Sequence, residues 1–219
     1  MTTELLAPAG GREALVAAVQ SGADAVYMGF GAFNARRSAR NFSDEEFRTA
    51  VSYCHLRGVK VYLTLNTLIT DRELPALAAE ARTASECGVD AILVQDWGVL
   101  ATLQKIIPDV PLHASTQMSL HTPSGAAAVQ EAGMTRAVLA REMTAKEIRE
   151  TRGAVSIELE SFVHGALCMS VSGQCYFSAM LGSRSGNRGM CAQTCRLPFS
   201  CEGGTGHDLS LRDLSLIQR

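Results

Sequence analysis

This sequence of 219 residues lacks the features that mark secreted and membrane proteins. Its N-terminus, "MTTELLAPAGG", has no basic region followed by an apolar stretch, so it does not look like a signal peptide. No run approaches the roughly 20 apolar residues that cross a bilayer. These absences predict a cytoplasmic protein that does not enter a membrane.

Charge of one sign and aromatic residues are also scarce. The formal net charge is −2 and aromatics make up 5% of the chain, so neither a strongly basic surface nor a dedicated platform for stacking bases is evident. No G-x-G-x-x-G motif follows the first predicted strand, which disfavours a dinucleotide-binding fold.

A loose repeat is present instead. Short apolar runs without alternation, typical of strands buried on both faces, follow alanine-rich segments with helical spacing. Glycine at 22, 58, 88 and 133 separates each helix from the next strand, because it accepts the left-handed conformation past a helix end. The predicted strands cover residues 5–7, 25–28, 59–65, 91–94, 111–114, 136–139 and 156–162.

This alternation predicts an α/β protein, a TIM-like (β/α) barrel that forms a single domain over residues 1–219. A doubly wound open sheet is the alternative. Ser43, Thr70 and Thr144 are the expected helix caps. A closed eight-stranded barrel usually needs about 250 residues, so we expect this barrel to be incomplete at the C-terminus.

Polar residues lie where the predicted strands end, and in such barrels these ends converge on one mouth that carries the chemistry. Amides and imidazoles among them suit hydrogen bonding to a polar ligand, although any one could be an ordinary loop residue. The candidates are Asn34, Arg36, Asn66, Gln95, His113, Gln117, Arg141, Glu160 and His164.

Five cysteines follow the seventh strand, in a Cys-rich loop over residues 164–201 with the pattern C-x6-C-x15-C-x3-C-x5-C. Disulfides are rare in the cytoplasm. A zinc site usually shows paired C-x2–4-C knuckles, and here only Cys191 and Cys195 form one. An iron–sulfur cluster also takes four thiolates and tolerates wider spacing, so the pattern favours a cluster over zinc and over incidental free thiols.

Two stretches without acidic residues, 25–43 and 161–201, carry the basic side chains of the predicted mouth. They could be solvated loops, but together they would favour an anionic guest such as a carboxylate metabolite or RNA phosphates. The residues proposed for phosphate or carboxylate contact are Arg36, Arg37, Arg184 and Arg188.

The segment "ESFVHGALCMSVSGQCYFS", with "GNRGMCAQTCRLPF", "GADAVYMGF", "TLNT", "VQD" and "HASTQ", resembles the signature of the U32 family of peptidase-like proteins. The resemblance spans essentially the whole chain. Its branches include collagenase-like proteases, proteins linked to oxygen-independent hydroxylation of ribosomal or transfer RNA with a 4Fe–4S cluster and prephenate, and hydroxylases of a quinone precursor. Around "HASTQ" and "VLARE" the chain resembles the RNA branch most.

The resemblance implies that Cys168, Cys175, Cys191 and Cys195 ligate the cluster, with Cys201 in reserve. It makes an RNA-hydroxylating enzyme the first hypothesis, with structured RNA or a small anionic metabolite such as prephenate as partner. Peptide hydrolysis, with Glu160 and His164 as catalytic groups, is the second, and an accessory electron-transfer protein the third. Family members generally continue into further segments, so we expect substrate-binding elements outside these 219 residues.

Overall fold

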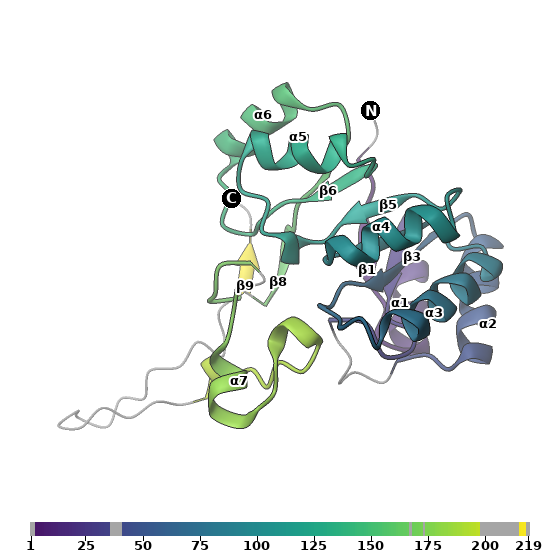
Figure 1. The fold of residues 1–219 in the computed structure, drawn as a ribbon. Coiled ribbons are helices and arrows are strands. Elements are labelled where there is room, and N and C mark those ends of the chain that lie inside the picture. The colour runs from purple at the N-terminus through teal and green to yellow at the C-terminus, as the bar shows by residue number, and fades with distance from the viewer. Residues whose placement is uncertain (1–2, 36–40, 167, 173, 198–214, 218–219) are drawn as a thin grey trace.

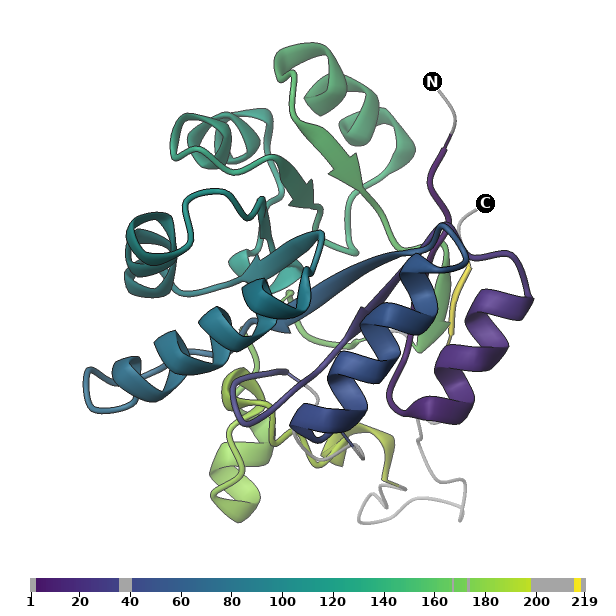
Figure 2. The same cartoon turned by 90° about the vertical axis from the view of Figure 1, so that its right-hand side faces the viewer.

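The computed structural model describes residues 3–35, 41–166, 168–172, 174–197 and 215–217. Seven parallel strands form one sheet in chain order, which confirms the predicted α/β architecture. Figure 2 shows the sheet curving as in part of a TIM barrel, with the helices ranged around its outer side. The strands are β1 (Leu6–Pro8), β2 (Ala25–Met28), β3 (Lys60–Leu65), β4 (Ala91–Val94), β5 (Leu112–Ala114), β6 (Arg136–Val138) and β7 (Glu158–Glu160).

One helix follows each of the first six strands, as Figure 1 shows. Ser43 and Thr144 cap their helices through capping boxes, as predicted. The expectation for Thr70 is wrong: Thr70 makes its hydrogen bonds within a turn to Glu73, and the helix begins later, at Leu74. The helices are α1 (Arg12–Gln20), α2 (Asp44–His55), α3 (Leu74–Cys87), α4 (Trp97–Ile106), α5 (Pro123–Glu131) and α6 (Ala145–Ala154).

The four glycines of the repeat all have positive φ angles, between 71° and 88°. Gly88 illustrates the reason, since it caps α3 in the left-handed conformation before the chain turns into β4. The sequence repeat is therefore a repeat of helix ends.

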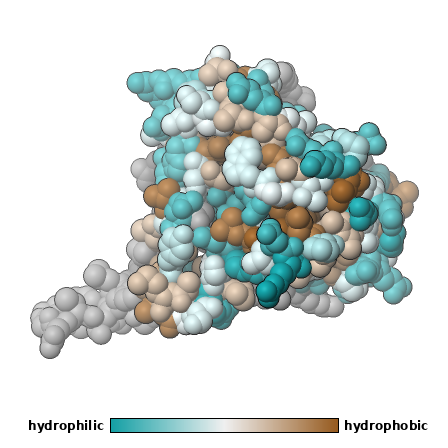
Figure 3. Space-filling view, in the orientation of Figure 1, coloured by the Kyte–Doolittle hydropathy of each residue, from teal (hydrophilic) through white to brown (hydrophobic). Residues whose placement is uncertain are grey.

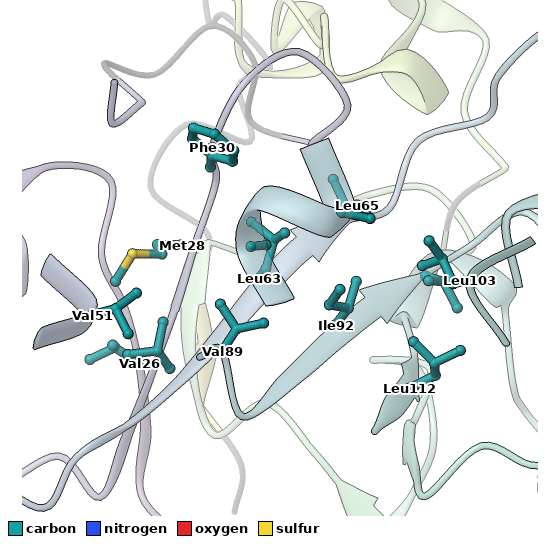
Figure 4. Close-up of a cluster of buried hydrophobic side chains, with 14 of the residues drawn as sticks. Val26, Met28, Phe30, Val51, Leu63, Leu65, Val89, Ile92, Leu103 and Leu112 are labelled. Carbon is teal, nitrogen blue, oxygen red and sulfur yellow. The ribbon is translucent and has the colours of Figure 1, made fainter. Parts of the chain in front are cut away.

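The main apolar core lies between the outer face of the sheet and the helices. Figure 4 shows Val26, Leu63 and Ile92 of neighbouring strands meeting Val51 and Leu103 from the covering helices. All five are fully buried. Burial on this scale is the main force that holds helices onto a parallel sheet.

The inner face of the sheet packs a smaller cluster. Tyr62, Leu93 and Val138 fill it, and Ala25 and Ala91 leave room where the strands curve. Tyr62 also contacts His113 edge-on, with ring centroids 5.0 Å apart.

An ionic network centred on a buried arginine lies at the amino ends of the strands. Arg136, which begins β6, is only 6% exposed. Its guanidinium contacts Glu4 before β1 at 2.8 Å, Glu158 at the start of β7 at 2.8 Å, and Glu160 at 3.4 Å. The Tyr62 hydroxyl donates to Glu4 at 2.9 Å. In the described sheet β1 and β7 are not hydrogen-bonded neighbours, so this network links the two edges.

Beyond β7 the chain forms a separate two-stranded sheet from β8 (His164–Ala166) and β9 (Ser215–Ile217), which run antiparallel. Between them the Cys segment, defined here as residues 168–197, contains α7 (Phe177–Gly182) and the short 3-10 turns Gly186–Arg188 and Thr194–Arg196. Figure 1 shows α7 apart from the helices of the barrel. Within the described residues, no helix is long and apolar enough to span a bilayer.

Replacing Arg136 with alanine should lower the free energy of unfolding by about 3–5 kcal/mol, because the carboxylates would lose their buried counter-ion. Urea denaturation followed by circular dichroism measures this. The matched control is Lys60→Ala, which removes a 55%-exposed partner of the same Glu4 and should cost less than about 1 kcal/mol. Equal losses in the two variants would contradict the structural role of Arg136.

Candidate functional site

A cavity of about 150 Å³ opens at the carboxyl ends of the strands, which we call the mouth. Its position agrees with the rule that barrel chemistry lies at this end. The polar residues lining it are Asn41, Thr64, Asn66, Ser115, Thr116, Gln117, Arg141 and Glu160. Four of these, Asn66, Gln117, Arg141 and Glu160, are candidates from the sequence.

Asn66 organises one wall of this mouth cavity. Its Oδ1 accepts a hydrogen bond from the Ala35 backbone N–H at 2.9 Å, and its Nδ2 donates to Ser115 Oγ at 3.1 Å. Gln117 lies on the same wall, and its buried Oε1 has no partner among the described residues. An unsatisfied buried amide oxygen is costly unless a ligand or water donates to it, so this wall is suited to a ligand that carries hydrogen-bond donors.

Gln95 and His113 are both more than nine-tenths buried and lie outside the cavity lining. Burial, with the positive charge of Arg136, lowers the pKa of His113 to about 3. The imidazole is therefore neutral at physiological pH, and its Nδ1 has no described partner. His113 packs inside the barrel beneath the cavity and cannot supply the positive charge of an anion site.

Arg141 and Glu160 bring opposite charges to the cavity. The Arg141 guanidinium lies 5.3 Å from the centre of the Phe162 ring. Burial raises the pKa of Glu160, although Arg136 partly offsets this. The structure does not join Glu160 to His164: His164 is exposed on β8, and none of the described contacts connects the two side chains.

The remaining candidates do not line the cavity or lie outside the described residues. Arg188 forms an ion pair with Glu73 and donates to the Leu68 carbonyl at 3.1 Å, so its charge is already neutralised. Arg184 is exposed, and its Nε donates to the Met190 carbonyl. Asn34 is buried against Gly29 and does not line the cavity. The prediction for Arg36, like those for Arg37 and Cys201, lies outside the described residues.

The cysteines fall into two groups. Cys54 and Cys87 belong to helices of the barrel, as expected of small core residues. In the Cys segment, Cys191 is exposed, and Cys168, Cys175 and Cys195 are half-buried.

Cys168 and Cys191 lie close enough to Cys195 to influence its thiol, and the backbone of Cys175 comes near Cys191. Burial raises the pKa of the Cys195 thiol, and the negative charges of Cys191 and Cys168 raise it further. A methyl group placed on Gly186 would lie 3.8 Å from both the Cys175 carbonyl oxygen and Cys191 Cβ. Among the described residues no three His, Cys, Asp or Glu side chains are arranged to hold a single metal ion.

The Cys segment is anchored to the loops of the mouth by polar contacts. The Leu68 N–H donates to the Asn187 carbonyl at 3.1 Å, beside the Arg188–Glu73 pair. On the other side, the Ser172 N–H donates to Glu142 at 3.0 Å. The outer surface of α7 exposes apolar side chains, with Met180 83% exposed, and Figure 3 shows apolar residues over this region.

His121 and Ser172 are polar residues that sequence reasoning missed. Both contact Glu142, and His121 has no motif around it that would have distinguished it from an ordinary loop histidine. Only the spatial meeting of the loops shows that these residues belong together.

Comparison with known proteins identifies the family to which this chain belongs. The profile of peptidase family U32 matches residues 10–219. The chain belongs to peptidase family U32. A solved U32 peptidase has a similar fold, with a TM-score of 0.64 over 75% of this chain and 70% of that one; at 19% identity the likeness concerns the fold alone.

Two U32 relatives are named for RNA hydroxylation. The 23S rRNA 5-hydroxycytidine C2501 synthase of Escherichia coli (strain K12) is 42% identical over 96% of this chain and 33% of its own length. The tRNA hydroxylation protein P1 of Bacillus subtilis (strain 168) is 40% identical over 90% of this chain and 46% of its own length. The chain thus spans less than half the length of both relatives.

Glu80 holds the loop that follows β2 by a hydrogen bond to its backbone. Its carboxyl group should also make the free energy of unfolding depend on pH. Its carboxylate accepts from the Ala32 N–H at 3.2 Å, and a Cβ at Gly31 (φ 63°) would clash with it. Burial, with a contribution from Asp44, raises the pKa of Glu80 from 4.5 to about 7. Between pH 4.5 and about 7 this carboxyl is ionised in the unfolded chain but still protonated in the folded one. The free energy of unfolding therefore falls as pH rises through this range.

Glu80→Gln should therefore match the wild type near pH 4 and exceed its unfolding free energy by about 1–2 kcal/mol at pH 8. Urea denaturation at a series of pH values gives the difference curve. Glu86→Gln, an exposed change on the same helix, should leave the curve unaltered. A Glu80 variant that shows no pH-dependent gain would refute this account.

Proposed function

We propose that this protein takes part in the hydroxylation of an RNA base, with the base entering the mouth cavity and a redox centre held by the Cys segment. The observation that carries the proposal is the joint placement of a polar cavity at the strand ends and a four-cysteine segment anchored to the loops around it. The similarity to two proteins named for RNA hydroxylation supports the choice of substrate.

The cavity chemistry suits a base. A base taken out of a stack is recognised by hydrogen bonds to its polar edge. Asn66 and Gln117 supply amide groups, and Ser115 supplies a hydroxyl. The unpartnered Oε1 of Gln117 would accept from an exocyclic amine or ring N–H. Arg141 and the exposed Arg184 are the described side chains that would meet the RNA backbone or the carboxylates of a small anionic metabolite such as prephenate.

Converting a C–H bond to C–OH is a two-electron oxidation, and the amides and carboxylates of the cavity are not redox-active, so they cannot accept those electrons. A 4Fe–4S cluster would supply electron transfer. Cys168, Cys175, Cys191 and Cys195 would hold it, since a cluster takes four thiolates and Cys168 and Cys191 already lie within electrostatic reach of Cys195. A zinc ion would need all four sulfurs at about 2.3 Å from one centre, and the C-x2–4-C pairing typical of zinc sites occurs here only between Cys191 and Cys195.

Peptide hydrolysis is the alternative that the family name suggests. The described geometry gives it little support. Ser172 and His121 both contact Oε2 of Glu142, and none of the described hydrogen bonds joins the imidazole to the Ser172 hydroxyl, which the proton transfer of a serine protease requires. Hydroxylation of a quinone precursor would need the same redox chemistry as hydroxylation of an RNA base. The two proposals differ only in the substrate that the cavity would bind.

Protein purified without oxygen should be brown and contain about four irons and four sulfides per chain. Alanine at any one of Cys168, Cys175, Cys191 and Cys195 should abolish the colour, because each would supply one ligand. Cys54→Ala, a change at a buried position of helix α2, should leave the spectrum intact. Colourless protein with one zinc would revive the single-ion site.

Deleting the gene should remove one hydroxylated nucleoside from ribosomal or transfer RNA, measured by mass spectrometry of digested RNA. The wild-type gene should restore the nucleoside, and Gln117→Ala should restore less than about a tenth of it, since one good hydrogen-bond contact to a base contributes about 1–3 kcal/mol. Cleavage of unfolded polypeptide by cluster-free protein, lost in His164→Ala, would overturn the proposal in favour of hydrolysis.

A further inference from the structure

Glu142 joins three segments at the mouth. One carboxylate oxygen accepts from the Ser172 N–H at 3.0 Å. The other lies 3.1 Å from Ser172 Oγ and 3.2 Å from His121 Nε2. The loop after β6 is thereby tied both to the loop after β5 and to the Cys segment.

His121 is itself held in place. Its Nδ1 lies 2.7 Å from the Ser119 carbonyl oxygen, which can only accept. The ring therefore bridges the Ser119 carbonyl and the Glu142 carboxylate, and these two contacts fix the direction in which the carboxylate points.

Ser172 is the point of attachment. It is fully buried, and its N–H, carbonyl and hydroxyl groups are all engaged. The carbonyl accepts from Ser119 Oγ, and Oγ accepts from the Arg141 N–H at 3.3 Å. Ser119 adopts a left-handed conformation (φ 57°) that places its side chain for this contact, and a non-glycine residue held there indicates that the surroundings enforce it.

The same loops line the mouth cavity. Arg141 precedes Glu142 directly, Gln117 precedes Ser119 by two residues, and both Arg141 and Gln117 line the cavity. Ser172 lies between Cys168 and Cys175 in the chain. One polar network therefore contacts the cavity walls and the stretch that carries two of the four thiols.

We propose that Glu142, oriented by His121, is a positioning residue that holds the stretch from Cys168 to Cys175 against the mouth and so sets where these two thiols lie relative to the cavity. The role of the thiols as ligands rests on the proposed function. The positioning by Glu142 does not rest on the proposed function, because its contacts are formed by the chain without any cofactor.

The test measures alkylation of each cysteine by iodoacetamide in reduced, metal-free protein, quantified by peptide mass spectrometry. In Glu142→Ala, Cys168 and Cys175 should react roughly tenfold faster, because the stretch loses the contacts that resist local opening. Cys191, which is already exposed, should change less than about twofold. Glu142→Gln keeps an acceptor for the Ser172 N–H and should fall between wild type and Glu142→Ala.

Glu150→Ala is the matched control, since Glu150 pairs only with the exposed Lys146 among the described ion pairs of the neighbouring helix; it should leave all four rates unchanged. Circular dichroism melting identifies any variant that fails to fold, and Ser172→Ala then provides an independent disruption of the same contact. Equal rates at Cys168 and Cys175 in wild type and in folded Glu142→Ala and Ser172→Ala would overturn the proposal.

In protein reconstituted with iron and sulfide, Glu142→Ala should alter the visible and electron paramagnetic resonance spectra of the cluster at unchanged iron content. If no variant binds iron, the cluster proposal fails, and the alkylation rates still decide whether Glu142 positions the thiols.

Discussion

A single buried guanidinium ties the two edges of the sheet together. Arg136 faces Glu4, Glu158 and Glu160, which belong to segments at opposite ends of the strand order. Removing a charge of this kind from water costs several kcal/mol per ion, and only the surrounding carboxylates and the Tyr62 hydroxyl offset that cost. This ionic contact at the amino ends therefore helps to hold together the two edges of the curved sheet whose carboxyl ends form the mouth.

The two ends of the strands differ in how their polar groups are satisfied. At the amino ends, opposite charges lie close together and are satisfied by one another. At the carboxyl ends, Gln117 keeps an unpartnered amide oxygen and Arg141 lies over an aromatic ring, so hydrogen-bonding capacity is left for a guest. Glu160 belongs to both, because it lines the cavity and touches Arg136.

Local signals in the sequence predicted most of the fold. Glycine past a helix end and a capping box at Ser43 or Thr144 depend on neighbouring residues, so they are visible without the tertiary structure. The prediction that Thr70 caps a helix was wrong because its hydroxyl donates to the side chain of Glu73 within a turn. The partners of Arg136 and Glu142 could not be predicted, since their contacts depend on strand register and on loops that meet only in the folded chain.

The Cys segment shares none of its residues with the apolar clusters of the barrel, and its described anchors to the barrel are hydrogen bonds and ion pairs. Local opening of such a segment costs far less than global unfolding. The barrel can thus complete its folding without this segment, and under the proposed function the cofactor would be acquired afterwards. Oxidative damage to that cofactor would then leave a folded scaffold that can bind it again.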